Sequence, residues 1–144
     1  MSEDDYKAPD LTLVGETHIE AYRETNGEVG YDWNGAPTLL LTTTGRTSGE
    51  QRTSALIFGR DGDDYLVVAS MGGAPEHPQW YKNLLAEPTA EVQVKSDHVN
   101  VVARTASDAE KPRLWKIMTD VWPNYDVYQT RTDRVIPLVV LSPR

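Results

Sequence analysis

Hydrophobic and polar positions change their spacing several times along the chain, and each change marks a predicted element. Short apolar or alternating runs, bounded by glycine, proline or aspartate, predict strands. These runs are residues 38–44, 52–60, 64–71, 90–96, 98–105 and 134–142. Apolar residues three or four positions apart predict helices at residues 12–25, 77–88 and 124–132, and another after a capping box at 107–110.

Four local signals refine these elements. The Asp-Gly sequence between 52–60 and 64–71 predicts a hairpin, and a tight turn is expected near Asp97. Pro78 fits the first turn of its helix, whereas Pro137 indicates a sheet edge or a bulge in the last strand. Three helical faces are predicted to be apolar, with Leu13, Ile19 and Tyr22 on the first, Trp80, Tyr81, Leu84 and Leu85 on the second, and Leu114, Ile117, Met118, Val121 and Trp122 on the third.

Strand pairs joined by tight turns predict a mainly antiparallel sheet, curled or closed, with helices around it. The fold class is therefore α+β, and mainly β. The length of 144 residues suits one domain, predicted at residues 11–144, after a polar and flexible tail at residues 1–10.

Composition narrows the classes of function. Lys and Arg number 14 against 22 Asp and Glu, and the net charge of −8 argues against general nucleic-acid binding. The absence of cysteine excludes disulfides and zinc-thiolate sites, and the three scattered histidines predict no metal site. With no signal peptide and no apolar run as long as a membrane span, we expect a cytoplasmic protein, with contact to a membrane surface left open.

The stretch "TTTGRTSGEQR" at residues 42–52 concentrates positive charge in this acidic chain. Its two glycines permit backbone conformations that expose consecutive N–H groups, and its two arginines carry fork-shaped donors suited to phosphate or carboxylate. The residues themselves leave two interpretations open, an ordinary turn between strands and an anion site. The candidate binding residues are Gly45, Arg46, Thr47, Ser48, Gly49 and Arg52.

Two further stretches contain candidate site residues. In "ASMGGAPEHPQWYKN" (69–83) a strand ends at two glycines and a helix begins, so backbone amides could contact a ligand. In "WPNYDVYQ" (122–129) Trp122, Tyr125 and Tyr128 recur every three residues and could form the wall of a pocket for a planar substrate. For these aromatic residues alone, packing in the core is the favoured interpretation.

Together, "GAPTLLLTTTGRTSGEQRTSALIF", "DYLVVASMGGAPEHPQWYKNL", "VYQTRTDRVIPLVVL" and the aromatic row resemble the deazaflavin-dependent nitroreductase family, which binds coenzyme F420. The resemblance covers residues 20–141 and implies a split β-barrel of about six antiparallel strands with peripheral helices. It also implies that the loop at residues 45–52 holds the phosphate and polyglutamate tail of F420.

The resemblance assigns roles to the other two stretches. The residues expected against the deazaflavin ring are Ser70, Met71, Gly72, Gly73, Pro78, Trp80, Tyr81 and Asn83. Trp122, Tyr125 and Tyr128 are expected on the substrate side, with Trp122 where some members have a tyrosine. Ser70 would hydrogen-bond at the reacting face, and Tyr125 or Tyr128 would orient the acceptor or donate a proton.

The function that this resemblance implies is hydride transfer from reduced F420 to a small, planar, electron-poor acceptor such as a quinone, enone or nitroaromatic. Two alternatives are a non-catalytic F420-binding or carrier protein and a barrel that binds FMN or haem. Split barrels often pair, but no feature of this sequence fixes the oligomeric state, so a homodimer stays open.

Overall fold

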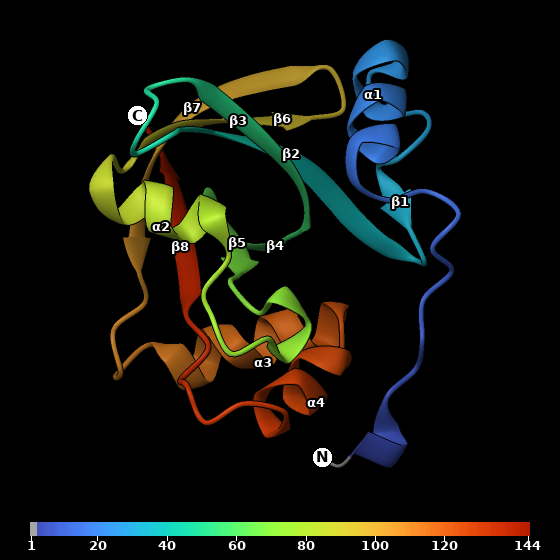
Figure 1. Cartoon of the computed structure of the whole chain (residues 1–144), viewed down its shortest axis with the longest axis vertical. Coiled ribbons are helices and arrows are strands. Elements are labelled where there is room, and N and C mark those ends of the chain that lie inside the picture. The colour runs from blue at the N-terminus through green and yellow to red at the C-terminus, as the bar shows by residue number, and fades with distance from the viewer. Residues whose placement is uncertain (1–2) are drawn as a thin grey trace.

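The computed structural model describes residues 3–144 as an antiparallel sheet with helices at its two ends (Figure 1). The helices are η1 (Glu3–Asp5), α1 (Gly15–Thr25), η2 (Met71–Gly73), α2 (Gln79–Ala86), α3 (Lys111–Val121) and α4 (Asn124–Thr130). The strands are β1 (Asp32–Trp33), β2 (Ala36–Thr44), β3 (Gln51–Ile57), β4 (Gly59–Asp61), β5 (Asp64–Val68), β6 (Thr89–Val94), β7 (Asp97–Thr105) and β8 (Leu138–Pro143).

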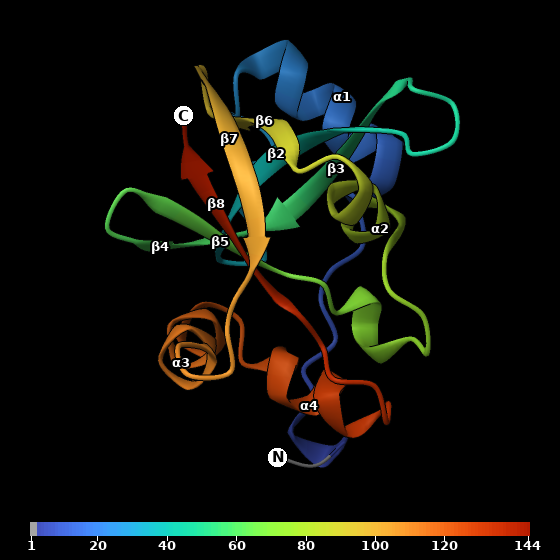
Figure 2. The ribbon, with the colours of Figure 1, turned by 90° about the vertical axis from the view of Figure 1, so that its left-hand side faces the viewer.

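All strand pairs in this part of the chain are antiparallel, in the order β1-β2-β6-β7-β8-β5-β4, with β3 paired to β2. The sheet curls into a half-barrel, with α1 at one end and α3 and α4 at the other (Figure 2). The predicted α+β class with a mainly antiparallel, curled sheet is confirmed. The described residues form eight strands rather than about six, because β1 and β4 are short separate strands.

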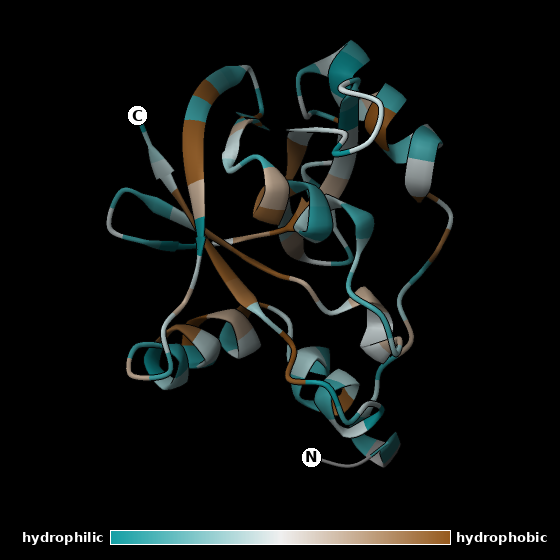
Figure 3. Cartoon of the chain, turned by 60° about the vertical axis from the view of Figure 1, so that its left-hand side comes forward, coloured by the Kyte–Doolittle hydropathy of each residue, from teal (hydrophilic) through white to brown (hydrophobic). Residues whose placement is uncertain are grey.

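Strands β5 and β8 pair with each other in the middle of the molecule, and each is buried on both faces. Tyr65, Val67 and Leu141 belong to an apolar cluster inside the half-barrel, whereas Leu66 and Leu138 belong to a second cluster under α3 and α4. This explains the continuous apolar runs of both strands, which are coloured brown in the centre of Figure 3. The two clusters share these strands and so form one core.

The strand predicted at 52–60 is wrong in its continuity, because it breaks at Phe58 into β3 and β4. The N–H of Phe58 donates a hydrogen bond to the carbonyl oxygen of Pro37, and its side chain is buried in the core. As a result β3 pairs with β2 around the 45–50 loop, while only β4 pairs with β5 across the Asp-Gly turn. Gly59 follows the break, where an added Cβ would lie 2.7 Å from Met118 Sδ, so glycine lets α3 approach the sheet.

Three other strand boundaries also differ from the prediction. The strand predicted at 64–71 ends at Val68. The tight turn expected near Asp97 is confirmed at residues 95–96, so β6 ends at Val94 rather than at residue 96, and β7 starts at Asp97 rather than at residue 98. Pro137 marks neither an edge nor a bulge: it precedes β8, which lies between β5 and β7, and its carbonyl oxygen accepts the N–H of Ala69.

The helices follow the sequence signals with shifted ends: α2 spans Gln79–Ala86 rather than 77–88, and α4 ends at Thr130 rather than at residue 132. Helix α1 begins at Gly15 rather than at residue 12, because Asp10 Oδ1 accepts the backbone N–H of Thr12 and holds this segment in a turn. The capping box is confirmed: the backbone N–H of Glu110 donates to Ser107 Oγ, and the N–H of Ser107 donates to Glu110 Oε2. Helix α3 begins after it, at Lys111, which leaves Pro112 in the first turn where proline is tolerated.

The predicted apolar faces are mostly buried, with Leu85 as the exception. Leu84 is buried in α2, but Leu85 is 63% exposed, so its predicted place on the buried face is wrong. An eight-residue helix buries a narrow stripe, and Trp80, Tyr81 and Leu84 already fill it.

The N-terminal segment runs from η1, beside α4, along the molecule to α1 (Figure 1). The backbone N–H of Lys7 donates to Asn124 Oδ1 at 3.1 Å, and Asn124 Nδ2 donates to the carbonyl oxygen of Lys7 at 2.8 Å. Glu3 forms an ion pair with Arg131, at the end of α4. The division into a flexible tail at 1–10 and a domain at 11–144 stays a prediction, and residues 1–2 lie outside the described residues.

Candidate functional site

The loop between β2 and β3 is closed by its own backbone and tied to α2. The N–H of Gly45 donates to the carbonyl oxygen of Glu50 at 2.7 Å, and the N–H of Gly49 donates to the carbonyl oxygen of Gly45 at 2.8 Å. Asn83 Oδ1 accepts both the backbone N–H of Arg46, at 3.2 Å, and its Nη1, at 2.8 Å. Arg46 Nη2 donates to Gln79 Oε1 at 2.7 Å, so α2 fixes the guanidinium in place.

A cavity of about 540 Å³, which we call the arginine cavity, opens between this loop and α2. It is lined by Gly45, Arg46, Thr47, Ser48, Arg52, Ser54, Gln79, Trp80 and Asn83. Two arginines and no carboxylate are among these lining residues. Such a wall is suited to an anionic group that accepts several hydrogen bonds.

Two carboxylates nevertheless pair with cations at or next to these residues in sequence, namely Arg52 itself and Lys82, the neighbour of Asn83. Glu50 Oε2 lies 3.3 Å from Arg52 Nη2 in an exposed ion pair, and Glu76 Oε2 lies 3.9 Å from Lys82 Nζ. Exposed pairs of this kind are weak, so an anionic ligand can displace Glu50 from Arg52 at little cost.

A second cavity, of about 460 Å³, continues from the first, and we call it the aromatic cavity. It is lined by Trp33, Ser54, Ala55, Leu56, Ile57, Val68, Ser70, Met71, Gly72, Pro78, Gln79, Trp80, Trp122, Tyr125 and Tyr128. None of these residues carries a formal charge. The two cavities share Ser54, Gln79 and Trp80, so they form one groove with a cationic end and an uncharged, aromatic end.

Two tyrosines from α4 form one wall of the aromatic cavity. The hydroxyl of Tyr125 has no hydrogen-bond partner within residues 3–144, although the residue is only 5% exposed. Its burial raises the pKa of Tyr125, so the hydroxyl stays protonated and able to donate. Tyr128 is half-buried, and its hydroxyl accepts Trp122 Nε1–H at 3.4 Å.

The structure brings most of the predicted site residues to this groove, but three lie outside the lining of both cavities: Gly49, Gly73 and Tyr81. The hydroxyl of Tyr81 lies 2.7 Å from Thr105 Oγ1, and its ring belongs to the core. At Gly73 an added Cβ would lie 2.6 Å from the carbonyl oxygen of Tyr128, so this glycine lets the turn pack against α4. Gly49 has a positive φ of 74° that closes the loop.

Several lining residues were not singled out from the sequence. Ser54, Leu56 and Ile57 come from the half-buried strand β3, and Gln79 stands between Pro78 and Trp80 at the start of α2. Nothing in the sequence marked Gln79 as a site residue, since an exposed polar residue at the start of a helix is ordinary. Its significance comes from the contact with Arg46, 33 positions away in the sequence.

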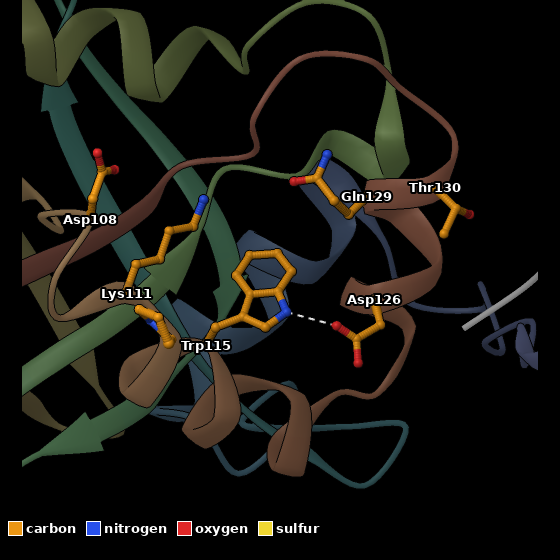
Figure 4. A pocket seen from close by; sticks show the side chains of 7 residues that line it. Asp108, Lys111, Trp115, Asp126, Gln129 and Thr130 are labelled. Carbon is orange, nitrogen blue, oxygen red and sulfur yellow. Dashed lines mark hydrogen bonds between the residues drawn. The ribbon is translucent and has the colours of Figure 1, made fainter.

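A third hollow, of about 570 Å³, lies between α3 and α4 on the other side of α4 (Figure 4). Most of its polar side chains have partners in the protein: Trp115 Nε1 donates to Asp126 Oδ1 at 2.7 Å, and Lys111 Nζ donates to the carbonyl oxygen of Ile136 at 2.6 Å. Gln129 binds the main chain of residues 134 and 136 through both ends of its amide. These bonds explain the residues as parts of the scaffold, and we place the candidate site in the other groove.

Comparison with known proteins gives concordant matches. The family model of the F420H(2)-dependent quinone reductases matches residues 14–143. An F420H(2)-dependent quinone reductase of Mycobacterium tuberculosis (strain ATCC 25618 / H37Rv) is 46% identical over 131 residues, covering 88% of this chain and 88% of that one. The match therefore spans the loop, the turn and the aromatic wall described above.

Two solved structures are similar as well. An F420-H2 dependent reductase (FDR-A) has a TM-score of 0.69 and 39% identity, covering 74% of this chain and 94% of its own. A structure described as a domain-swapped dimer has the same TM-score and identity, covering 74% of this chain and 80% of its own.

Proposed function

This chain belongs to the F420H(2)-dependent quinone reductase family, and we propose that it reduces a small quinone in the aromatic cavity. Membership makes it an F420H2-dependent reductase with coenzyme F420 as its cofactor. When bound, F420 supplies the hydride, and the protein supplies binding, orientation and exclusion of water. The observation that supports the proposal best is the charge difference along one groove.

The groove fits the coenzyme in its residues as well as in its shape. F420 joins a flat deazaflavin ring to a multiply anionic tail. The arginine cavity offers two guanidiniums, exposed loop hydroxyls and no lining carboxylate, whereas the aromatic cavity offers uncharged aromatic and backbone surfaces. Trp80 lines both cavities, which supports placing the junction of ring and tail beside it.

We assign the tail to Arg46, Arg52, Thr47 and Ser48, with Gly45 and Gly49 shaping the loop. In this assignment Gln79 and Asn83 hold the guanidinium of Arg46 ready, so little side-chain freedom is lost on binding.

The ring is assigned to the turn that contains Ser70, Met71 and Gly72, and to Pro78 and Trp80. Tyr81 and Gly73 would support this surface through packing, as their contacts indicate. The Ser70 hydroxyl, which makes no hydrogen bond within residues 3–144, would donate at the reacting edge.

Tyr125 and Tyr128 would bind the acceptor. A quinone carbonyl gains negative charge as it accepts a hydride, so a nearby protonated hydroxyl stabilises the product. The unpartnered hydroxyl of Tyr125 suits this role, while Trp122 holds Tyr128 in the wall through its indole N–H.

Oxidation of reduced F420 by the purified protein, followed by the return of F420 absorbance, tests the proposal. The acceptor panel should include a quinone, an enone and a nitroaromatic compound. We expect the quinone to support the highest kcat/KM. Binding of F420 without oxidation of its reduced form by any of these acceptors would instead favour the carrier alternative. Preferential binding of FMN or haem would favour the alternative of a barrel that binds one of those two cofactors.

We also propose that two copies of the chain can pair, and that the protein works in the cytoplasm. The similarity to a domain-swapped dimer supports pairing, and sedimentation velocity across a concentration series tests it. Among the described residues, no helix is long and apolar enough to cross a bilayer. Contact with a membrane surface stays a prediction, as does the cytoplasmic location, and fractionation of expressing cells tests both.

A further inference from the structure

The turn after β5 has an unusual backbone. Met71, Gly72 and Gly73 all have positive φ angles, of 46°, 64° and 85°. This conformation is easy for the glycines but strained for methionine, whose side chain disfavours it by about 1–2 kcal/mol. A turn that holds a non-glycine residue in this state needs contacts that favour it over the alternatives.

Two arginines from outside the turn provide these contacts. Arg134 Nε donates to the carbonyl oxygen of Ala74 at 2.8 Å, and its Nη2 and Nη1 donate to those of Ser70, at 2.8 Å, and Ala69, at 3.2 Å. Arg131 Nη1 donates to the carbonyl oxygen of Gly72 at 3.2 Å. Four of the six carbonyl oxygens in residues 69–74 are thus held by guanidinium groups.

The surroundings of Arg134 indicate that binding the turn is its main role. It is half-buried and forms no ion pair with a carboxylate within residues 3–144. Its remaining contact is with His77 Nδ1, 3.1 Å from Nη1. A buried cation without a counter-ion is unfavourable unless its donors are satisfied, and here main-chain carbonyl oxygens satisfy them.

The direction of these bonds decides where the amides of the turn point. A trans peptide places its N–H opposite its C=O. Because the carbonyl groups of Ala69 and Ser70 point to Arg134, the N–H groups of Ser70 and Met71 point away from it. Ser70 and Met71 line the aromatic cavity, and Arg134 does not.

We propose that Arg134 is a positioning residue for the reaction. It holds the carbonyl groups of the turn so that the backbone amides of Ser70 and Met71, and the hydroxyl of Ser70, face the bound deazaflavin ring. This inference rests on the proposed function, because it requires the ring to lie in the aromatic cavity. Arg134 itself touches neither ring nor acceptor. Its effect passes through the turn.

The test is the Arg134→Gln variant, with Arg113→Gln as its matched control. The guanidinium of Arg113 is also held by more than one hydrogen bond, to both carboxylate oxygens of Asp61, and Arg113 lines neither cavity. We expect Arg134→Gln to lower kcat by about 10²-fold, as expected when reacting groups are misplaced by about 1 Å, while the Kd for F420 changes by less than about threefold. The control should match wild type in both quantities.

Amide hydrogen exchange gives a readout that needs no cofactor and no turnover. In Arg134→Gln the amides of residues 70–74 should exchange faster than in wild type, whereas those of the β6–β7 hairpin should not change. Unchanged exchange in the turn would contradict the positioning role, whatever the protein's activity. This readout separates the positioning role from the proposed function. The proposed function fails instead if none of the tested acceptors supports oxidation of reduced F420 by the wild-type protein.

The Arg134→Lys variant keeps the positive charge and provides a second test if the glutamine variant does not fold. Lysine cannot reproduce the fork that reaches three carbonyl groups, so we expect kcat to fall by about tenfold with F420 binding retained. A lysine variant with the kcat and exchange rates of wild type would show that charge alone suffices, and the proposal would be wrong.

Discussion

Arg46 illustrates how a single residue can be prepared for a ligand by neighbours distant in sequence. Its guanidinium lies at the surface, yet Asn83 and Gln79 of α2 fix its orientation. Asn83 is itself buried, and its Nδ2 donates to Thr43 Oγ1 at 3.3 Å. The side chain thus gains a defined geometry from the scaffold, as the proposed contact with the tail of F420 requires.

Replacing Arg46 with alanine should weaken F420 binding much more than folding. A charge-assisted hydrogen bond contributes about 1.5–3 kcal/mol, which is about ten- to a hundredfold in Kd. Stability should change by less than about 1 kcal/mol, because the side chain is exposed. F420 titration and thermal unfolding of Arg46→Ala measure the two effects. Arg60→Ala, a change of another exposed arginine, should alter neither, and unchanged titration in folded Arg46→Ala would contradict the tail assignment.

Tyr125 tests the opposite end of the groove. Tyr125 is buried as a residue, but its hydroxyl keeps some exposure and makes no hydrogen bond in residues 3–144, so Tyr125→Phe should change stability by less than about 1 kcal/mol. If the hydroxyl donates to the reduced acceptor, kcat should fall by about 10²-fold. Urea unfolding and quinone-dependent turnover measure both, with Tyr65→Phe, another buried tyrosine, as the control. Wild-type turnover in Tyr125→Phe would remove Tyr125 from the mechanism.

At the scale of elements, the start of α3 shows a local signal that tertiary contacts reinforce. The capping box of Ser107 and Glu110 is a short-range feature, but Arg104 at the end of β7 also binds Glu110, with Nη1 2.5 Å from Oε2 and Nη2 3.0 Å from Oε1. The helix start is therefore tied to the sheet.

This arrangement predicts a pH dependence of stability. The hydrogen bond from Arg104, followed by the backbone bond from Ser107, lowers the pKa of Glu110 from 4.5 to about 2. A pKa lowered on folding stabilises the native state fully above about 4.5, and the contribution is lost as the pH falls toward about 2. Urea midpoints of wild type and Glu110→Gln should differ by a constant amount above pH 4.5 and converge below it.

The Arg104→Met variant provides the check on cause. Because the guanidinium is the larger influence on the carboxyl group, removing it should reduce the same acid-limb dependence. If Glu110→Gln and wild type keep a constant difference down to pH 2, the folded-state pKa of Glu110 is not lowered.

At the scale of the whole molecule, β5 and β8 join two apolar clusters into one cooperative unit. Val67 and Leu141 lie in the cluster inside the half-barrel, while Leu66 and Leu138 lie in the cluster under α3 and α4. The aromatic wall of the site belongs to the second cluster through Trp122 and Tyr125. Its position therefore depends on the strands that also form the barrel.

Leu138→Ala and Leu141→Ala should each lower the free energy of unfolding by about 2–5 kcal/mol, because both leucines are fully buried. Both variants should unfold in one transition, since the clusters share their strands. Far-UV circular dichroism and tryptophan fluorescence during urea unfolding measure this. Separate midpoints for the two signals in either variant would mean that the helical end unfolds independently of the barrel.

Much of the fold and part of the candidate site were predicted from local signals. The capping box, the β6–β7 hairpin and the concentration of donors in the 45–52 loop depend on residues close together in sequence. Two of the predictions that failed depend on how the elements pack. Phe58 breaks a continuous β pattern because Pro37 accepts its N–H, and Leu85 is exposed because other residues fill the buried stripe of α2.

By itself, the sequence determined the antiparallel α+β class, the concentration of donors at one loop and the likeness to an F420-binding family, because glycine, arginine and period-two apolar patterns act through short-range geometry. The tertiary structure alone decided that two cavities join at Trp80, that α2 orients Arg46 and that Arg134 holds the turn at Ser70. Each of these depends on contacts between residues more than 30 positions apart, whose side-chain directions are fixed only when the sheet curls and the helices pack on it.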